Sequence, residues 1–411
     1  MIKRTPSDFQ VEEVLSPAFL ALVRPEVGGT LSPAAGAPFA LYRLHKESLA
    51  TPEAVGHIAR ELKIHAHAVA YAGLKDKHAR AIQHVTLNLQ HAANAPEKAS
   101  SPGWQLERLG SVPRSITATD IECNRFRITI RNLTADECAD LDEAARLLAF
   151  PAPSPGALRI VNYFGDQRFG SARHGQGFIA RHLIRGDFEG ALRLAIATEA
   201  RKDRMEQKVF KRTLCEHWGR WREALPKLRR CPERKAIERL SFSGGDFRAA
   251  FCALPYLLQQ MSVYAYQSFL WNAIARRLVA LRCAPLGKVI AADDPFGEML
   301  FPAAEAIPAE LADVQVPLLS RKTELREPWK AAAEDVLKAE GIETAALQIP
   351  GVRRPFFGEE PRALFFAAAD FQTTPPQPDE TAKEKARLKR TVAFSLPRGS
   401  YATVVLRALG Q

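Results

Sequence analysis

Residues 162–170 read NYFGDQRFG, and this stretch decides how the rest of the chain is interpreted. It places aromatic rings beside an amide, an arginine and two glycines in a short segment. A pocket for a nucleobase needs a ring for stacking and polar groups that hydrogen-bond to the edge of the base. A tight structural turn with buried aromatic side chains would have the same composition. The stretch therefore predicts either a nucleobase pocket or such a turn.

Two other segments combine a glycine turn with side chains that can do chemistry. Residues 72–78 read AGLKDKH, so a turn that follows a strand presents Asp76 among three potential cations. Neighbouring positive charge favours the ionised carboxylate that a nucleophile needs. Residues 396–403 read LPRGSYAT, and here a second glycine turn presents Tyr401. A solvated loop and a plain β-hairpin are the alternative interpretations of the two segments.

Together with the N-terminus, these segments resemble the TruD family of tRNA pseudouridine synthases. Residues 3–13 look like the family's opening motif, residues 72–79 look like the segment with its nucleophilic aspartate, and residues 162–170 match its most distinctive signature. Residues 396–403 are similar to the closing motif. Further resemblances are carried by Gln83, Asn124, Phe126, Gln267, Ser268, Trp271, Asn272 and Arg407. The matches keep the family's order from residue 3 to residue 407.

The resemblance implies an α+β fold in two parts. A pseudouridine-synthase catalytic core, made of an antiparallel sheet with flanking helices, is expected at residues 1–175 and 361–411. A family-specific TRUD α+β domain is expected to be inserted at residues 176–360. The first and last motifs would then meet in one cleft, although they lie at opposite ends of the chain.

The resemblance also implies an activity. The expected reaction converts a uridine of tRNA, uridine 13 in the D-arm, to pseudouridine without a cofactor. Asp76 would act as the nucleophile or as a base, with Lys3 as its charge partner. A catalytically silent RNA-binding protein on the same scaffold is the first alternative. Another RNA-modifying enzyme, such as a methyltransferase, is the second, and the lack of a glycine-rich cofactor loop argues against it.

Four residues are expected to contact the substrate. Phe9, Asn162 and Tyr401 match substrate-contacting positions of the family, and Phe164 would line the same pocket. An asparagine amide has the donor and acceptor that are needed to read the imide edge of uracil.

The chain departs from the family pattern at three places. Ala81 stands where the family usually has a threonine, and this change removes a hydroxyl close to the Asp76 loop. Ala408 replaces the glutamate that often follows the closing arginine. The charged, proline-containing residues 374–390 look like an insertion relative to shorter family members.

The charge of the chain is concentrated in its middle. The 411 residues carry a formal net charge of +11. Between Arg159 and Leu240 there are 20 Lys and Arg residues but only 10 Asp and Glu residues. Clustered cations mixed with aromatic residues are typical of a surface that binds a polyanion, so we expect this region to contact tRNA phosphates. A solvated basic helix face is the alternative.

Several classes of protein are disfavoured by what the sequence lacks. The six cysteines form no C-x-x-C pair, and no P-loop, dinucleotide or H-E-x-x-H motif is present. We therefore expect neither a metal nor a small-molecule cofactor. The longest apolar run is far shorter than the ~18 residues of a membrane helix, and the start lacks the apolar core of a signal peptide. The expected protein is cytoplasmic, does not bind a membrane and is monomeric.

Local patterns predict individual elements. Alternating apolar residues predict a strand at 126–130, and Thr134 is expected to cap a helix that runs to about Phe150. Thr51 is expected to cap another helix, with Pro52 at the first helical position. Long helical periodicity covers residues 178–200, 201–221 and 261–281. The end of the chain, residues 401–409, is expected to be a strand or a short helix.

Overall fold

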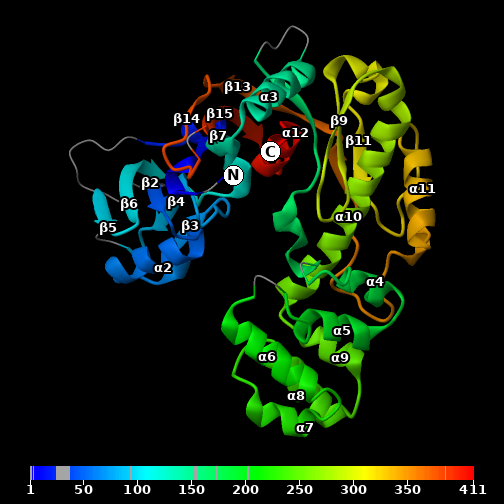
Figure 1. Ribbon diagram of the computed structural model, residues 1–411. Coiled ribbons are helices and arrows are strands. Elements are labelled where there is room, and N and C mark those ends of the chain that lie inside the picture. The colour runs from blue at the N-terminus through cyan, green and yellow to red at the C-terminus, as the bar shows by residue number, and fades with distance from the viewer. Residues whose placement is uncertain are drawn as a thin grey trace. The chain divides into compact units, whose positions relative to one another are not determined.

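The computed structural model describes residues 2, 4–24, 38–92, 95–150, 156–172, 174–200, 203–384 and 386–411. The chain divides into two compact units, which are treated separately below (Figure 1). Unit 1 consists of Met1–Ile160 and Phe366–Gln411, and unit 2 consists of Val161–Phe365. The stretch NYFGDQRFG therefore packs with unit 2. The assignment of a catalytic core at 1–175 with 361–411 and an inserted domain at 176–360 stays a prediction.

Unit 1 is built on one large mixed sheet. Among the described residues the sheet has 11 strands, and its main order is β5-β6-β2-β4-β1-β7-β15-β13-β8. β1 runs parallel to β4, whereas β2 pairs antiparallel with β4 and β6, and β7 pairs antiparallel with β1 and β15. β3 and β14 pair with β4 and β15 outside this path. The strands are β1 (Phe9–Leu15), β2 (Phe39–Glu47), β3 (Val69–Tyr71), β4 (Arg80–Asn88), β5 (Lys98–Ser101), β6 (Trp104–Val112), β7 (Ile121–Leu133), β8 (Leu158–Val161), β13 (Phe365–Thr373), β14 (Gln377–Pro378) and β15 (Leu388–Pro397).

Helices flank this sheet. α2 (Thr51–Glu61) packs the apolar stripe that contains Val55 and Ile58 against β2 and β4. α1 (Pro17–Leu20) and α3 (Ala135–Leu148) follow β1 and β7, and α12 (Ala402–Ala408) follows β15. The end of the chain is thus a helix, which decides between the two expected possibilities. The mixed α+β class predicted from the sequence is confirmed.

The two predicted helix caps have different outcomes. Thr134 caps α3 as expected, because its hydroxyl accepts the N–H of Glu137 (3.1 Å). The prediction for Thr51 is wrong, since Ala50 is the N-cap of α2 and its N–H is satisfied by the Glu53 carboxylate (2.9 Å). The Thr51 hydroxyl points instead to a buried partner on β4, as described below.

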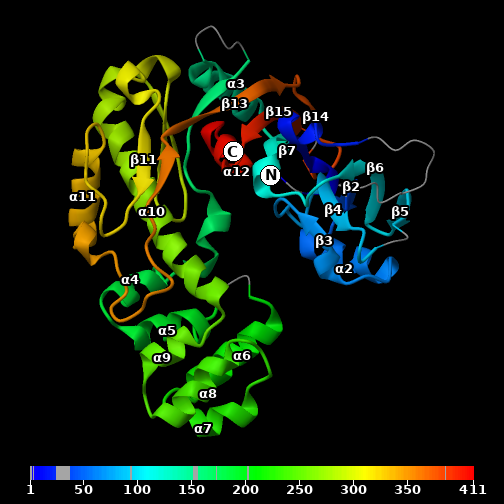
Figure 2. The ribbon, with the colours of Figure 1, turned by 180° about the vertical axis from the view of Figure 1, so that it is seen from behind.

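Unit 2 is organised around one long helix. α10 (Tyr256–Arg282) runs from a cluster of helices to two small β-ribbons (Figures 1 and 2). Its buried side chains include Gln267, which donates to Leu319 O and Gly358 O (2.8 Å each), and Trp271, whose indole N–H donates to Val316 O (2.9 Å). The other elements are η4 (Asp166–Ala172), α4 (Ile179–Ile184), α5 (Phe188–Ile196), α6 (Met205–Glu216), α7 (Trp221–Ala224), α8 (Arg234–Ser243), α9 (Phe247–Cys252), α11 (Lys330–Glu340), and the ribbons β9 (Val289–Ala292) with β10 (Met299–Pro302) and β11 (Gln315–Leu318) with β12 (Glu360–Ala363).

The helices predicted at 178–200 and 201–221 are shorter than expected. Gly186 has a φ of 73°, a left-handed conformation that ends α4. Asp187 then caps α5, because its carboxylate accepts the N–H of Gly190 (2.8 Å). Apolar periodicity continues across this break, so the pattern alone did not reveal it. No helix in the described part of the chain is long and apolar enough to cross a membrane.

A buried charge network anchors the segment that precedes β1. The Arg131 guanidinium on β7 donates to Asp8 (2.9 Å), Asp379 (2.9 Å) and Glu380 (3.2 Å). Asp8 and Asp379 are buried, whereas Glu380 is exposed. Asp379 also accepts the N–H of Asn132 (2.9 Å). The N-terminal segment, β7 and the loop before β15 are therefore joined through one arginine.

We expect Asp379→Asn to lower the free energy of unfolding at pH 7 by on the order of 3 kcal/mol, because it removes one of the two buried carboxylates that compensate the Arg131 charge. Burial alone would raise the pKa of Asp379, but hydrogen bonds from Thr381, Asn132 and Arg131 lower it to about 2. The stabilisation is therefore complete above the unfolded carboxyl pKa of about 3.9 and is lost as the pH falls toward 2. Urea unfolding at pH 7 and near pH 2.5 should show the difference between the two proteins shrinking.

The matched control is Glu380→Gln, which removes an exposed partner of the same arginine. Its cost should stay below about 1 kcal/mol. Equal costs for the two variants would contradict the assignment of the stabilisation to the buried pair.

Candidate active site

The loop that carries Asp76 connects β3 to β4 and is held by its main chain. The buried Lys46 ammonium on β2 donates to the carbonyl oxygens of Asp76 (2.9 Å) and Lys75 (3.4 Å). The N–H of Lys75 donates to the Thr51 hydroxyl (2.9 Å), which in turn donates to Gln83 Oε1 (2.9 Å). Burial lowers the pKa of Lys46 to about 8, although the negative charge of Asp76 opposes this effect. The conformation of the loop is thus set by groups on β2, β4 and α2.

Glu13 on β1 fixes the side chain that precedes Asp76. Its carboxylate contacts Lys75 Nζ (2.6 Å) and accepts the N–H of His84 (2.9 Å). Glu13 is only 1% exposed and closes the motif at residues 3–13. The opening motif and the Asp76 loop are therefore in direct contact, and the sequence analysis assigned no role to Glu13. A carboxylate at the same two-residue spacing as buried Phe9 and Val11, on the buried face of a strand, was the available signal.

Phe9 lies on the same face of the sheet as Glu13, because the two residues are an even number of positions apart on β1. Its ring contacts Phe126 edge-on (centroids 6.0 Å apart), and Phe126 contacts Phe394 (5.7 Å). An aromatic row thus crosses β1, β7 and β15 on the face that holds the Asp76 loop.

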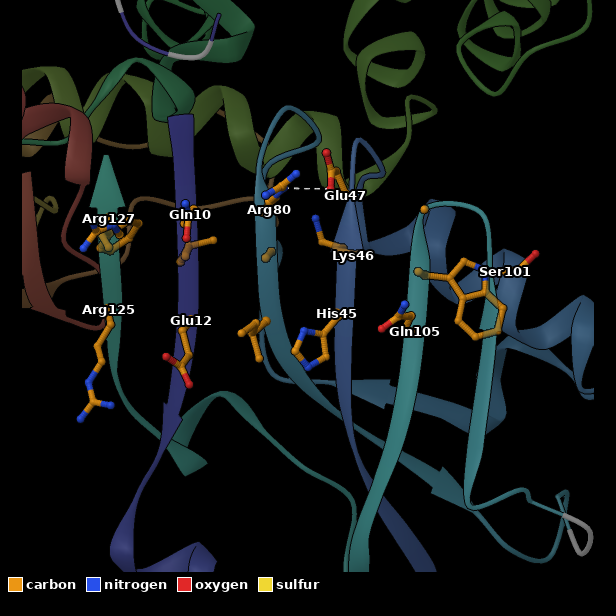
Figure 3. Close-up of a pocket in the computed structure, with 16 residues that line it drawn as sticks. Gln10, Glu12, His45, Lys46, Glu47, Arg80, Ser101, Gln105, Arg125 and Arg127 are labelled. Atoms are coloured by element: carbon orange, nitrogen blue, oxygen red, sulfur yellow. Dashed lines mark hydrogen bonds and ion pairs between the residues drawn. The ribbon is translucent and has the colours of Figure 1, made fainter. Parts of the chain in front are cut away.

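A cavity of about 540 Å³ has polar side chains from the opposite face (Figure 3). Gln10, Glu47 and Arg80 line it together with Arg125 and Arg127. Gln10 and Glu47 alternate along their strands with Phe9 and Lys46, so these polar groups project away from the Asp76 loop. Lys46, which holds the Asp76 loop, is also among the residues that line the cavity.

Tyr401 is the N-cap residue of α12 and is half-buried. β15, which leads into it, is separated from β1 by β7 alone, so the strands nearest the two chain ends lie close together in one sheet. Unit 1 therefore holds Phe9, Asp76 and Tyr401. Lys3, the expected charge partner of Asp76, lies outside the described residues.

Asn162 and Phe164 belong to unit 2, where both side chains contact Arg362 on β12. The guanidinium donates to Asn162 Oδ1 (2.6 Å) and to the Asn162 carbonyl (2.8 Å), and it lies over the Phe164 ring, 3.9 Å from the centroid. The Asn162 amide nitrogen donates to Ala363 O (3.1 Å). Asn272 on α10 exchanges two hydrogen bonds with the Phe164 main chain (2.8 and 2.9 Å). The orientation of both expected substrate-contacting side chains is thus fixed within unit 2.

Sequence reasoning missed Arg362 because nothing near it in the chain marks it. It stands about 200 residues after Asn162, in a segment dense in prolines and charges. Asn272, by contrast, was already part of a segment that resembled the family, although no contact with Phe164 was expected.

Several cations of the basic region at 159–240 form ion pairs with carboxylates. All but one of these carboxylates lie in the same region and are already subtracted in its charge count, and only Glu340 comes from outside it. These pairs are Arg181–Glu340, Lys211–Asp203, Arg212–Glu199, Arg220–Glu223, Arg229–Glu206 and Arg234–Glu238. Contact between this region and tRNA phosphates stays a prediction.

Within the ranges that the structure describes, no three or more His, Cys, Asp or Glu side chains are grouped so that they could hold a metal ion.

Comparisons with known proteins agree on one family. The model of the TruD family, tRNA pseudouridine synthase D, matches residues 1–409. The tRNA pseudouridine synthase D of Aquifex aeolicus is 28% identical over 418 residues, which cover 99% of this chain and 97% of the relative. A probable tRNA pseudouridine synthase D of Methanococcus maripaludis is 27% identical over 379 residues, covering 89% of this chain and 92% of the relative. The crystal structure of a TruD protein from Methanosarcina mazei, at 23% identity, gives a TM-score of 0.69 over 99% of this chain and 92% of that chain.

The fold and these matches define an isomerase with the pseudouridine-synthase fold and an insert domain, as predicted from the sequence. The chain belongs to the TruD family.

Arg362→Lys should lower kcat/KM for pseudouridine formation by about tenfold to a hundredfold. Lysine keeps the charge but cannot hold the two Asn162 oxygens and the Phe164 ring together, and a hydrogen bond to a charged group contributes about 1.5–3 kcal/mol. Arg353→Lys, at an exposed arginine nearby, is the control and should behave as wild type. Normal kinetics of a folded Arg362→Lys protein would show that this clamp has no part in catalysis.

Proposed function

We propose that this protein converts uridine 13 in the D-arm of tRNA to pseudouridine without a cofactor, with Asp76 as the nucleophile or base. One observation carries the proposal. The Asp76 loop is fixed from β2 and α2 through its main chain, by Lys46 and Thr51, and from β1 through the Lys75 side chain, by Glu13. A solvated surface turn, the alternative interpretation of AGLKDKH, has no need of buried anchors on three elements. Membership of the TruD family supplies the substrate class.

The proposed reaction is balanced within the substrate. The bond from the sugar C1′ to N1 of uracil breaks, a bond from C1′ to C5 forms, C5 loses a proton and N1 gains one. Asp76 either attacks the sugar or removes a proton from it, and it is regenerated at the end of the cycle. A stacked base cannot be detached, turned and rejoined in place, so the uridine must be flipped into a pocket.

The aromatic and amide residues have separate roles in this proposal. Phe9 and Tyr401 stack against the flipped nucleotide, and Phe164 lines the pocket. Asn162 reads the imide edge of uracil. Its contacts with Arg362 and Ala363 O support this role, because they fix which end of the amide accepts and which end donates.

The test of the proposal is Asp76→Asn, assayed by carbodiimide mapping of tRNA with purified protein and no added cofactor. The amide is similar in size but cannot act as an anionic nucleophile or base, so isomerisation at uridine 13 should be abolished while Kd for tRNA changes by less than about twofold. Asp140→Asn, at an exposed aspartate on α3, is the matched control. Turnover by Asp76→Asn, or wild-type modification only at another position, would refute the corresponding part of the proposal.

A second test separates stacking from packing at Tyr401. Stacking of an aromatic ring on a base contributes about 1–3 kcal/mol. Tyr401→Ala should therefore lower kcat/KM by about tenfold to a hundredfold, and Tyr401→Phe should change it little. If Tyr401 only packs α12 against the sheet, Tyr401→Ala will lower the melting temperature and leave the kinetics of the folded protein normal. Kinetics and thermal stability measured on the same three proteins distinguish these results.

A further inference from the structure

Lys46 is a buried cation whose partners are all main-chain carbonyls. It is 3% exposed, and its ammonium donates to the carbonyl oxygens of Leu49 (2.7 Å), Asp76 (2.9 Å) and Lys75 (3.4 Å). No carboxylate forms an ion pair with it in the part of the chain that the structure describes. Buried lysines are rare unless they are paired, because desolvation of the charge is costly. The position of Lys46 therefore has to be explained by what its ammonium does locally.

The three donors of an ammonium match these three acceptors. Two of the acceptors are consecutive peptide groups of the Asp76 loop, and the third lies in the turn before α2. Rotation of either peptide group beside Asp76 would break a charge-assisted hydrogen bond from a buried ammonium. Lys46 thus fixes the direction in which the Asp76 side chain leaves the main chain.

The surroundings of Lys46 determine when it carries its charge. Burial lowers the pKa of Lys46 to about 8, the carboxylates of Asp76 and Glu53 raise it, and Lys75 lowers it further. Glu13, on β1, which β4 separates from β2, is paired with Lys75. Ala81 is the register partner of Lys46 on β4, and its methyl group offers no hydroxyl to the ammonium where the family usually has a threonine. The hydrogen bonds to the loop are therefore weakened by deprotonation at mildly alkaline pH.

We propose that the protonated Lys46 ammonium is the positioning group of the catalytic aspartate, holding the Asp76 loop in its reactive conformation. This inference rests on the proposed function, because it concerns the same reaction. Lys46 acts through the loop and does not touch the substrate. A misplacement of about 1 Å can reduce a rate about a hundredfold, so a modest shift of the loop has a large kinetic effect.

The experiment compares Lys46→Met, Lys46→Arg and, as a matched control, Lys98→Met. Lys98 is an exposed lysine on β5 of the same sheet. At pH 7 and saturating tRNA, Lys46→Met should reduce the single-turnover rate about a hundredfold, with Kd for tRNA within about twofold of wild type. Lys46→Arg keeps the charge and should recover at least about a tenth of the wild-type rate. Lys98→Met should match wild type.

The pH profile provides a readout that a purely structural role would not change. Wild-type activity should fall as the pH rises through about 8. This decline should be absent in Lys46→Arg, because a guanidinium stays protonated. Ionisation of uracil itself is common to both proteins and cancels in the comparison. If Lys46→Met does not fold, this comparison of wild type with Lys46→Arg still decides the matter.

Two results would overturn the inference. One is a folded Lys46→Met protein with a normal rate, and the other is an alkaline decline that is the same in wild type and in Lys46→Arg. Asp76→Asn, measured in the same series, separates this failure from failure of the proposed function. If Asp76→Asn is inactive and Lys46→Met is normal, only the positioning role of Lys46 is refuted. If Asp76→Asn is active, the proposed role of Asp76 in the reaction is refuted.

Discussion

Unit 1 depends on the rule that a buried charge needs a partner. Arg131 can lie inside the unit only because Asp8 and Asp379 accept its hydrogen bonds, and Lys46 can do so only because three carbonyl groups converge on it. Such contacts contribute little net stability, because desolvation offsets much of the attraction. Their value lies in specificity, since the wrong arrangement would leave a charge without a partner. The same rule fixes the N-terminal segment, the loop before β15 and the loop that carries Asp76.

The sequence was most informative where local physics decides the structure. The alternation of Phe126, Ile128 and Ile130 predicted a strand, and β7 contains these residues. Thr134 was identified as a cap because a threonine stands before an acidic first turn. Thr51 had the same local pattern, yet a tertiary partner, Gln83, takes its hydroxyl. The break between α4 and α5 at Gly186 was also missed. Both helices bury apolar residues at helical spacing, so the sequence pattern continues across the break.

The candidate site could be predicted only in part. Asp76, Asn162 and Tyr401 stand in recognisable motifs, so their positions were marked without knowledge of the fold. Lys46 and Arg362 lie in segments without a recognisable motif. Their roles are visible only in the folded protein, where they contact residues distant in the chain, Asp76 and Asn162. The charge count of the region 159–240 could not include Glu340, which pairs with Arg181 from a distant segment.

The position of β7 inside the sheet has a consequence for how the protein is made. Strands β1, β2, β4, β6 and β7 are complete once residue 133 has been synthesised, but β15, the second neighbour of β7, begins only at Leu388. At about 5–20 residues per second, the ribosome needs roughly 10–50 s to add the intervening residues. During that time one long edge of β7 has no partner strand, and such edges pair readily with other chains. Arg125 and Arg127 on this strand supply the charge that opposes such pairing, so the nascent chain carries its own protection against aggregation until its last strand arrives.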